Sequence, residues 1–215
     1  MADRFSSKNI ALITIAILLV IMLISSFRIW PMIKQEKLLI IKEGVLEKIS
    51  SHQLSTGESY AYNYSSENES VTVHYGLVQR SGCLEFTVSE IKNNGTSCIK
   101  ADGTDSGGSN LTLNNQFIYF FRPWMLAVKP GWNWNVDIYT NITTVSKLSS
   151  FKFYFAGETS YRGREAFIVK QTEDNSNNEA TMLIDKEKRI LLKEEGNGYQ
   201  VEIIYGPFLL AQQGE

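Results

Sequence analysis

The sequence predicts a mainly β protein, in which an N-terminal transmembrane helix and an amphipathic helix precede an antiparallel β-meander curved into a half-barrel or curved sheet. Three observations predict this class: one uncharged apolar run, many later segments with apolar residues at every second position, and turn-forming residues between those segments. We expect a cytoplasmic tail over residues 1–8, a transmembrane anchor over 9–30, an amphipathic helix over 31–50 and an extracytoplasmic β-domain over 51–215.

The composition limits the classes of function. Of the 215 residues, 43% are hydrophobic and 20% are charged, which is close to the average for globular proteins. The net charge of −2 argues against a nucleic-acid partner, because such proteins usually need a basic surface. Residues 1–50 carry seven Lys or Arg and four Asp or Glu, so their balance is +3 and that of the remainder is −5. This asymmetry favours a membrane-associated N-terminus with a mildly acidic, water-facing domain.

The apolar run Asn9–Phe27 is the predicted anchor. At about 1.5 Å per residue it spans about 28 Å, the thickness of a hydrocarbon core. Trp30 follows at an interfacial position. A cleaved signal peptide is the main alternative, but its apolar region is usually shorter and ends in a small-x-small site. A buried core helix is a further alternative. We expect an uncleaved anchor whose partner is the lipid bilayer.

The orientation of the anchor follows from features downstream of it. Basic residues flank both sides of the run, so the positive-inside rule does not decide. Five Asn-x-Ser/Thr triplets and both cysteines lie after the run, although any single triplet is expected by chance in a chain rich in Asn, Ser and Thr. We expect a single-pass plasma-membrane protein with its N-terminus inside and its C-terminal domain outside. The candidate glycosylation sites are Asn63, Asn68, Asn94, Asn110 and Asn141.

Residues 34–50 are predicted to form the amphipathic helix. Leu38, Ile41, Val45 and Ile49 fall on one helical face. Gly44 weakens this prediction by about 1 kcal/mol relative to Ala. The apolar face is expected to pack on the following domain, or else to lie on the membrane surface.

From residue 57 onward, period-two alternation predicts about nine or ten strands with one buried face. Short polar and glycine-containing segments separate them. The alternating sets centre on Tyr60–Tyr64, Val71–Leu77, Leu84–Val88, Leu111–Phe121, Val136–Ile142, Phe151–Phe155, Phe167–Val169, Met182–Ile184, Ile190–Leu192 and Val201–Ile203.

The two cysteines conflict with a local turn signal. Asn94-Gly95 is typical of a two-residue hairpin, which would place Cys83 about 27 Å along its strand from the residue facing Cys98. A disulfide needs Cα atoms within about 7 Å. We expect the disulfide, with a wide loop over Ser89–Ser97 in place of the tight turn. Closing this loop would stabilise the fold by about 3 kcal/mol.

No set of residues predicts catalysis or metal binding. Asp105-Ser106-Gly107-Gly108 resembles the nucleophile motif of chymotrypsin-like serine proteases, but neither His52 nor His74 stands in that family's setting. His74 is expected to face solvent or to be hydrogen-bonded. Asp102 and Asp105 lack the regular spacing of a calcium loop. We therefore expect no enzyme activity, no catalytic residues, no metal and no cofactor.

The densest aromatic segment runs from Phe117 to Trp134. Two interpretations remain open: ordinary core with a proline-bounded loop, or an apolar mouth for a lipid or a partner segment. In the second, Arg122 and Lys129 would meet an acidic headgroup at the rim. The candidate residues of this apolar site are Phe121, Trp124, Trp132 and Trp134.

The last third carries a family resemblance. Tyr161–Val169 contains Gly-Arg-Glu before an apolar strand, and Met182–Lys193 contains Ile-Asp-Lys-Glu before a second apolar pair. Across residues 150–205 this pattern resembles the last strands of the LolA/LolB-type lipoprotein carriers, and is similar to related uncharacterised surface proteins of archaea and Gram-positive bacteria. The resemblance implies an antiparallel half-barrel around helices, with an apolar cavity for acyl chains and with residues 34–50 as a cavity helix. It transfers no catalytic residues, and a permanent anchor departs from the shuttling of carriers.

We therefore expect a membrane-anchored, extracytoplasmic β-domain of non-enzymatic type. It would bind a lipid, lipoprotein or other apolar ligand, or act as an accessory subunit with other envelope proteins. The alternative is a structural or adhesive, pilin-like surface subunit. The Lys8-Asn9 junction does not resemble an archaeal pilin processing site, so the alternative ranks lower.

Overall fold

The computed structural model describes residues 39–89, 94–100, 103–104, 110–111, 120–140, 146–174 and 176–210. The chain divides into two compact units, Met1–Ile40 with Tyr139–Ser146, and Ile41–Ile138 with Lys147–Glu215. The packing and the sites described below belong to the second unit. The strands are β1(Leu39–Glu43), β2(Ser59–Ser66), β3(Ser70–Arg80), β4(Cys83–Ser89), β5(Asn94–Lys100), β6(Asn133–Thr140), β7(Ser146–Tyr161), β8(Arg164–Glu173), β9(Glu179–Asp185), β10(Leu191–Gly196) and β11(Tyr199–Tyr205).

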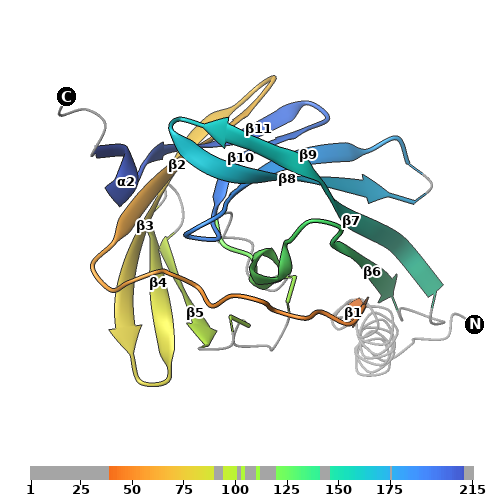
Figure 1. Cartoon of the computed structure of the whole chain (residues 1–215), viewed down its shortest axis with the longest axis horizontal. Coiled ribbons are helices and arrows are strands. Elements are labelled where there is room, and N and C mark those ends of the chain that lie inside the picture. Colours follow the sequence, from red (N-terminus) through yellow and green to blue (C-terminus); the bar gives the residue numbers. More distant parts are fainter. Residues whose placement is uncertain are drawn as a thin grey trace, which may run out of the picture. The chain divides into compact units, whose positions relative to one another are not determined.

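The described strands form one sheet in the order β1-β6-β7-β8-β9-β10-β11-β2-β3-β4-β5. The pairings from β7 to β11, from β11 to β2 and from β2 to β5 are antiparallel. β1 and β5 stand at the two ends of this order, so the sheet is open, and Figure 1 shows its curvature. The prediction of a mainly β, antiparallel curved sheet is confirmed. The only described helices are the 3₁₀ helix η2(Pro123–Ala127) and the four-residue α2(Pro207–Leu210).

The sheet is more than a single meander. β2–β5 and β6–β11 are two meanders in sequence order, and the pairing of β11 with β2 joins them. In this pairing Val201 stands opposite Tyr64, and Ile203 opposite Tyr62. The last strand of the chain therefore lies beside one of the first, a neighbour relation that alternation within each strand does not encode.

Alternation within the strands agrees with the period-two pattern. In β3, Val73, Tyr75 and Leu77 are buried while His74 between them is exposed. Tyr62 of β2 stands opposite Val73 and is also buried. A strand such as β3 forms because its apolar face is removed from water while its polar face remains in it.

The helix predicted over residues 34–50 is wrong within the described residues, and residues 34–38 lie outside them. Leu39–Glu43 is strand β1, and the chain from Gly44 to Ser50 is not helical. The Gly44 N–H donates a 2.8 Å hydrogen bond to the Asn135 carbonyl, so the backbone here is held by β6 rather than by a helical turn. Val45, expected on the buried helical face, is 99% exposed.

The predicted anchor Asn9–Phe27 and the tail before it lie outside the described residues. Among the residues that are described, no helix is both long and apolar enough to cross a bilayer. The anchor stays a prediction from the sequence.

The predicted disulfide between Cys83 and Cys98 is confirmed, and their Cα atoms lie 5.7 Å apart. The expected wide loop over Ser89–Ser97 is wrong, and the rejected tight turn is absent too, because Asn94-Gly95 belongs to β5 and Asn94 pairs with Ser89. The two cysteines are diagonal neighbours: Cys83 stands opposite Lys100, and Cys98 opposite Glu85.

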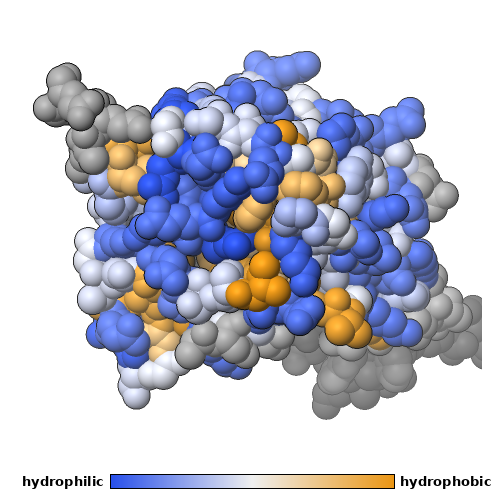
Figure 2. All heavy atoms as spheres, in the orientation of Figure 1, coloured by the Kyte–Doolittle hydropathy of each residue, from blue (hydrophilic) through white to orange (hydrophobic). Residues whose placement is uncertain are grey.

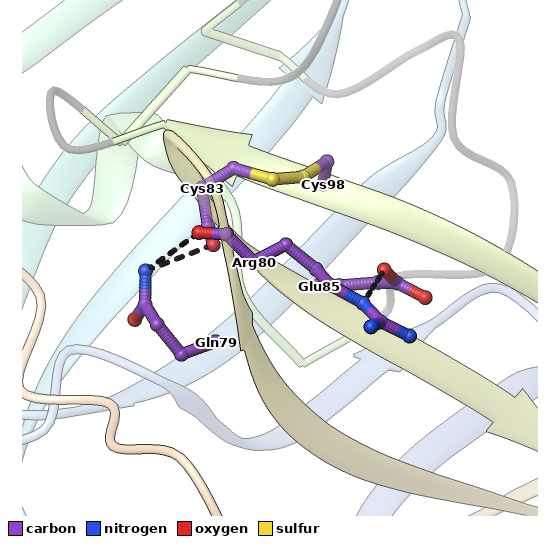
Figure 3. The surroundings of a disulfide bond; sticks show 5 residues. All are labelled: Gln79, Arg80, Cys83, Glu85 and Cys98. Atoms are coloured by element: carbon purple, nitrogen blue, oxygen red, sulfur yellow. Dashed lines mark hydrogen bonds and ion pairs between the residues drawn. A yellow bond between two sulfur atoms is a disulfide. The ribbon is translucent and has the colours of Figure 1, made fainter.

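Figure 3 shows the surroundings of this bond at the β3–β4 turn. The Gln79 amide donates to the carbonyls of Arg80 and Cys83, at 3.1 Å in each case. Arg80 Nε lies 2.7 Å from a carboxylate oxygen of Glu85. These contacts and the disulfide tie β3, β4 and β5 into one unit.

Candidate functional site

A short segment of the chain fills the inner side of the sheet. We call residues 120–128 the interior segment. It contains η2, which begins at Pro123 and lies within the curve of the sheet in Figure 1. Proline suits the first turn of a helix because its missing N–H would have no helical partner there. All residues of the interior segment except Arg122 are buried. The Leu191 N–H donates a 2.7 Å hydrogen bond to the Phe120 carbonyl, which ties the segment to β10.

Phe120 lies at the centre of one aromatic cluster. Its ring centroid is 5.2 Å from that of Tyr60, 5.9 Å from Tyr62, 4.8 Å from Tyr75 and 5.2 Å from Phe86. These rings come from β2, β3 and β4, so the cluster binds the interior segment to the first meander. Tilted and offset contacts at such distances stabilise beyond the burial of area alone.

The tryptophans form a second cluster toward β6 and β7. Trp124 stacks on Trp132 with 5.5 Å between ring centroids, and Phe153 lies 5.2 Å from Trp124 and 5.4 Å from Trp134. The Trp134 indole N–H donates to the Gly44 carbonyl at 3.0 Å, whereas the buried Trp124 N–H has no partner in the described structure.

All four candidate residues of the apolar site therefore lie in the core. Phe121 and Trp124 are fully buried, and Trp132 and Trp134 are 8% and 2% exposed. Of the two interpretations left open by the sequence, the structure supports ordinary core. Figure 2 shows a mainly hydrophilic face, with apolar residues in small separate groups.

The two cations expected at a rim have other partners. Arg122 Nη2 lies 2.8 Å from a carboxylate oxygen of Glu194, and the Tyr199 hydroxyl donates to the other oxygen at 2.8 Å. Burial and the charge of Glu194 raise the pKa of Tyr199. Lys129 lies 3.5 Å from Glu47, and both of these side chains are exposed. The pairing of Arg122 leaves it unsuited to meet a headgroup.

The motif that carries the family resemblance forms a structural network. Asp185 at the end of β9 is fully buried and accepts hydrogen bonds from Arg164 and from the backbone N–H groups of Glu187 and Lys188. Arg189 has a φ of 59° and donates to the Val128 carbonyl at 2.8 Å, which holds the turn after β9 against the interior segment. The motif thus marks a turn and its supports rather than a reactive site.

A second polar group lies at the start of β2. Burial by itself would raise the pKa of Glu58, but hydrogen bonds from Lys188, Tyr60 and the Ser55 N–H lower it below the usual value. Burial lowers the pKa of His52, whose Nδ1 has no hydrogen-bond partner in the described structure. The His52 ring lies edge-on to Phe121 with centroids 6.2 Å apart. The described contacts of His52 are those of a packed side chain.

The two histidines and the acidic residues form no metal-binding group among the described residues. His74 is exposed on β3, whereas His52 packs against the interior segment. Within the described ranges no three His, Cys, Asp or Glu side chains are placed to hold a metal ion. Asp102 and residues 105–108 lie outside those ranges.

The candidate glycosylation sites differ in their surroundings. Asn68 is exposed in the β2–β3 turn, and Asn63 accepts a 3.0 Å hydrogen bond from the Ser70 hydroxyl. The Asn110 amide donates to Glu43 at 2.8 Å, so a glycan at Asn110 would disrupt this contact. Asn94 begins β5, and Asn141 lies outside the described residues.

Sequence reasoning missed the buried charges. Glu194 occupies an inward position in the same alternation as Leu192, and Asp185 directly follows the buried Ile184. A charged residue at an inward position of an alternating strand was the available signal, because a buried charge needs a partner. The pattern could not show which arginine pairs with each buried carboxylate, because both arginines are distant in the sequence.

Comparison with known proteins identifies no relative by sequence: no family model and no curated protein matches the chain. Among solved structures it is similar to MucB, with 15% identity and a TM-score of 0.37, covering 68% of this chain and 51% of that one. A MucA/MucB complex from Pseudomonas aeruginosa matches with 11% identity and a TM-score of 0.37, over 68% and 49% of the two chains. The chain thus spans about half the length of these MucB structures.

An exported protein with a YmcC-like fold from Bacteroides fragilis matches with 11% identity and a TM-score of 0.40, covering 73% of this chain and 98% of that one. The likeness to these structures is one of architecture at low identity, and it assigns this chain to no family and to no activity.

Proposed function

We propose that this chain is a membrane-anchored, extracytoplasmic β-domain of non-enzymatic type that serves as an accessory subunit of an envelope complex. The observation that carries the proposal is the filled inner side of the sheet. The interior segment lies on the inner side of the sheet, where the sequence resemblance implied a cavity for acyl chains, and its rings pack on both meanders. A domain with a filled interior binds its partners through its outer surface and its edges.

The extracytoplasmic placement is supported by the disulfide. Bonds such as Cys83–Cys98 form and persist in oxidising compartments and are rare in reducing ones. The apolar run Asn9–Phe27 would hold the domain at the membrane, and both cysteines follow it. The N-terminus would then lie inside and residues 51–215 outside.

The non-enzymatic role is supported by the partners of the buried charges. Glu194 is paired with Arg122, Asp185 with Arg164, and Arg189 with a backbone carbonyl. Charges committed to such partners stabilise a fold and are poorly placed to exchange protons with a substrate.

Two measurements on the full chain test the proposal. Alkaline carbonate washing should leave the protein in the membrane pellet, and blue-native electrophoresis after mild solubilisation should place it in a complex of defined size. Native mass spectrometry of the solubilised protein should find no acyl lipid bound in fixed stoichiometry. Release into the carbonate supernatant would contradict the predicted anchor. An acyl lipid bound in fixed stoichiometry would favour the lipid-binding interpretation instead. A mature N-terminus near residue 8 would favour the pilin-like alternative.

A further inference from the structure

A shallow pocket of about 530 Å³ lies where β6 meets β7. Small-molecule sites usually have volumes of about 300–1,000 Å³, so the pocket is large enough for a ligand. Asn133 and Asn135 of β6 and Lys152 of β7 line it, and all three are exposed while Trp134 and Phe153 between them are buried. The pocket therefore opens on the face of the sheet opposite the core.

Its polar groups are available to a ligand. A side-chain amide offers two donor hydrogens and one carbonyl acceptor. Among the described residues, nothing hydrogen-bonds to the side chains of Asn133 and Asn135. They stand two positions apart on one strand, so both amides face the same side at a separation of about 7 Å. That spacing suits hydroxyl or acetamido groups at well-separated positions on one small molecule.

Aromatic side chains complete the pocket. Tyr154, half-buried, lines it, and Lys152 Nζ lies 6.0 Å from the centroid of its ring. Trp132, which is 8% exposed, also lines the pocket and is held by its stack on Trp124. The Phe155 N–H donates to the Trp132 carbonyl at 2.9 Å, which fixes this part of the lining across the two strands. The aromatic part of the pocket is thus supported by the core beneath it.

We propose that this pocket binds a saccharide. A pyranose ring presents weakly positive C–H groups on its faces, which suit the negative face of an aromatic ring, and hydroxyls at its edge, which suit amides and an ammonium group. A lipid chain would find too little apolar lining, and a metal ion would find no carboxylate among the lining residues. The proposal concerns the outer face of the sheet, so it does not depend on the anchor or on the filled interior.

The test uses the full chain in a detergent without a sugar headgroup. Maltotriose, chitotriose and mannotriose are titrated separately to millimolar concentrations, and tryptophan emission and saturation-transfer NMR are recorded. We expect at least one of the three to bind saturably and to change the emission, because Trp132 lines the pocket. Tyr154→Ala and Asn135→Ala should each weaken this binding about tenfold or more.

Two matched variants serve as controls. Tyr205→Ala removes an exposed ring on β11, and Asn68→Ala removes an exposed amide in a turn; both should leave saccharide binding unchanged. Melting temperatures confirm that each variant is folded. The proposal is overturned if none of the three saccharides binds, or if Tyr154→Ala and Asn135→Ala bind as the unmodified protein does. Carbonate extraction is unaffected by either outcome, so this test and that of the anchor fail separately.

Discussion

Arg164 and Asp185 form a two-point ion pair between the start of β8 and the end of β9. Arg164 Nε lies 2.8 Å from one carboxylate oxygen of Asp185, and Nη2 lies 3.1 Å from the other. The Asp185 side chain is fully buried, whereas that of Arg164 is 21% exposed. Hydrogen bonds to Asp185 raise the pKa of Arg164, although burial opposes this. Hydrogen bonds from Arg164 and from the turn backbone therefore take the place of water around the Asp185 carboxylate.

Asp185→Ala should lower the free energy of unfolding by about 1–3 kcal/mol, because it leaves two turn N–H groups without their acceptor and leaves Arg164 with Glu187 in place of two carboxylate partners. Urea unfolding followed by circular dichroism measures this loss. Glu85→Ala, which breaks the more exposed pair with Arg80, is the matched control and should cost far less. Equal losses in the two variants would show that Asp185 has no special structural role.

Trp124→Ala should cost about 3–5 kcal/mol, because it removes a fully buried ring that contacts Trp132 and Phe153. Chemical unfolding monitored by the remaining tryptophans reports the change. Tyr205→Ala, which truncates a partly exposed ring, should stay close to the unmodified protein. A small loss for Trp124→Ala, accompanied by new binding of an apolar dye, would mean that the interior segment leaves the sheet readily.

Replacing both cysteines by Ser should lower the free energy of unfolding by about 3 kcal/mol, because the bond closes a loop with a sequence separation of 15. The comparison is between the double variant and the unmodified protein under non-reducing conditions. The unmodified protein should resist alkylation until a reductant is added. Labelling of both thiols without reductant would contradict the bond.

The protein should lose stability as the pH falls below about 6.5, because burial holds the pKa of His52 below its ordinary value in the folded state. A depressed histidine pKa means that the neutral imidazole is favoured in the fold. The contribution of neutral His52 to stability is therefore fully present above the histidine pKa of the unfolded chain. It declines as the pH falls toward the lower pKa of the folded state. Hydrogen bonds also lower the pKa of Glu58, and that contribution is lost at lower pH than the contribution of His52, because a carboxylate ordinarily has the lower pKa.

His52→Gln should flatten that part of the pH profile, whereas His74→Gln on the exposed face of β3 should preserve it. Melting temperatures measured at half-unit steps of pH make the comparison. A profile for His52→Gln that follows the unmodified protein would assign the dependence to another group.

The sequence predicted best the strands that have one buried face and one solvent-exposed face. β3 and β4 alternate because Tyr75 and Phe86 face the core while their neighbours are more exposed; in β2 the alternation is weaker, since Ala61 is buried beside Tyr62. β1 was misread, since Leu38, Ile41 and Val45 have helical spacing although residues 39–43 pair with β6. Gly44 was the sequence feature that argued against a helix here. In the structure, a Cβ at this position would lie 3.1 Å from the Asn135 carbonyl oxygen.

Composition alone identified the aromatic segment as the candidate site, but the packing of the surrounding strands determines whether its rings are exposed or buried. The aromatic segment was identifiable, but whether its rings lie in a mouth or in the core depends on which strands surround it. That depends in turn on the pairing of β11 with β2, which no local pattern encodes. Asn94-Gly95 is a second case in which a local pattern does not decide the structure. The pair is typical of a turn, but in the structure it belongs to β5 and pairs with β4.

The pairing of β11 with β2 has a consequence for the way the protein is made. The Tyr62 hydroxyl donates to the Leu191 carbonyl across a sequence separation of 129 residues. A chain that leaves the ribosome with its N-terminus first must keep the apolar faces of β2 and β3 without their β11 partner until nearly all of the polypeptide has emerged. Such distant contacts slow folding and lengthen the exposure of unpaired edges. A nascent chain of this kind would depend on holding factors at the exit site during its synthesis.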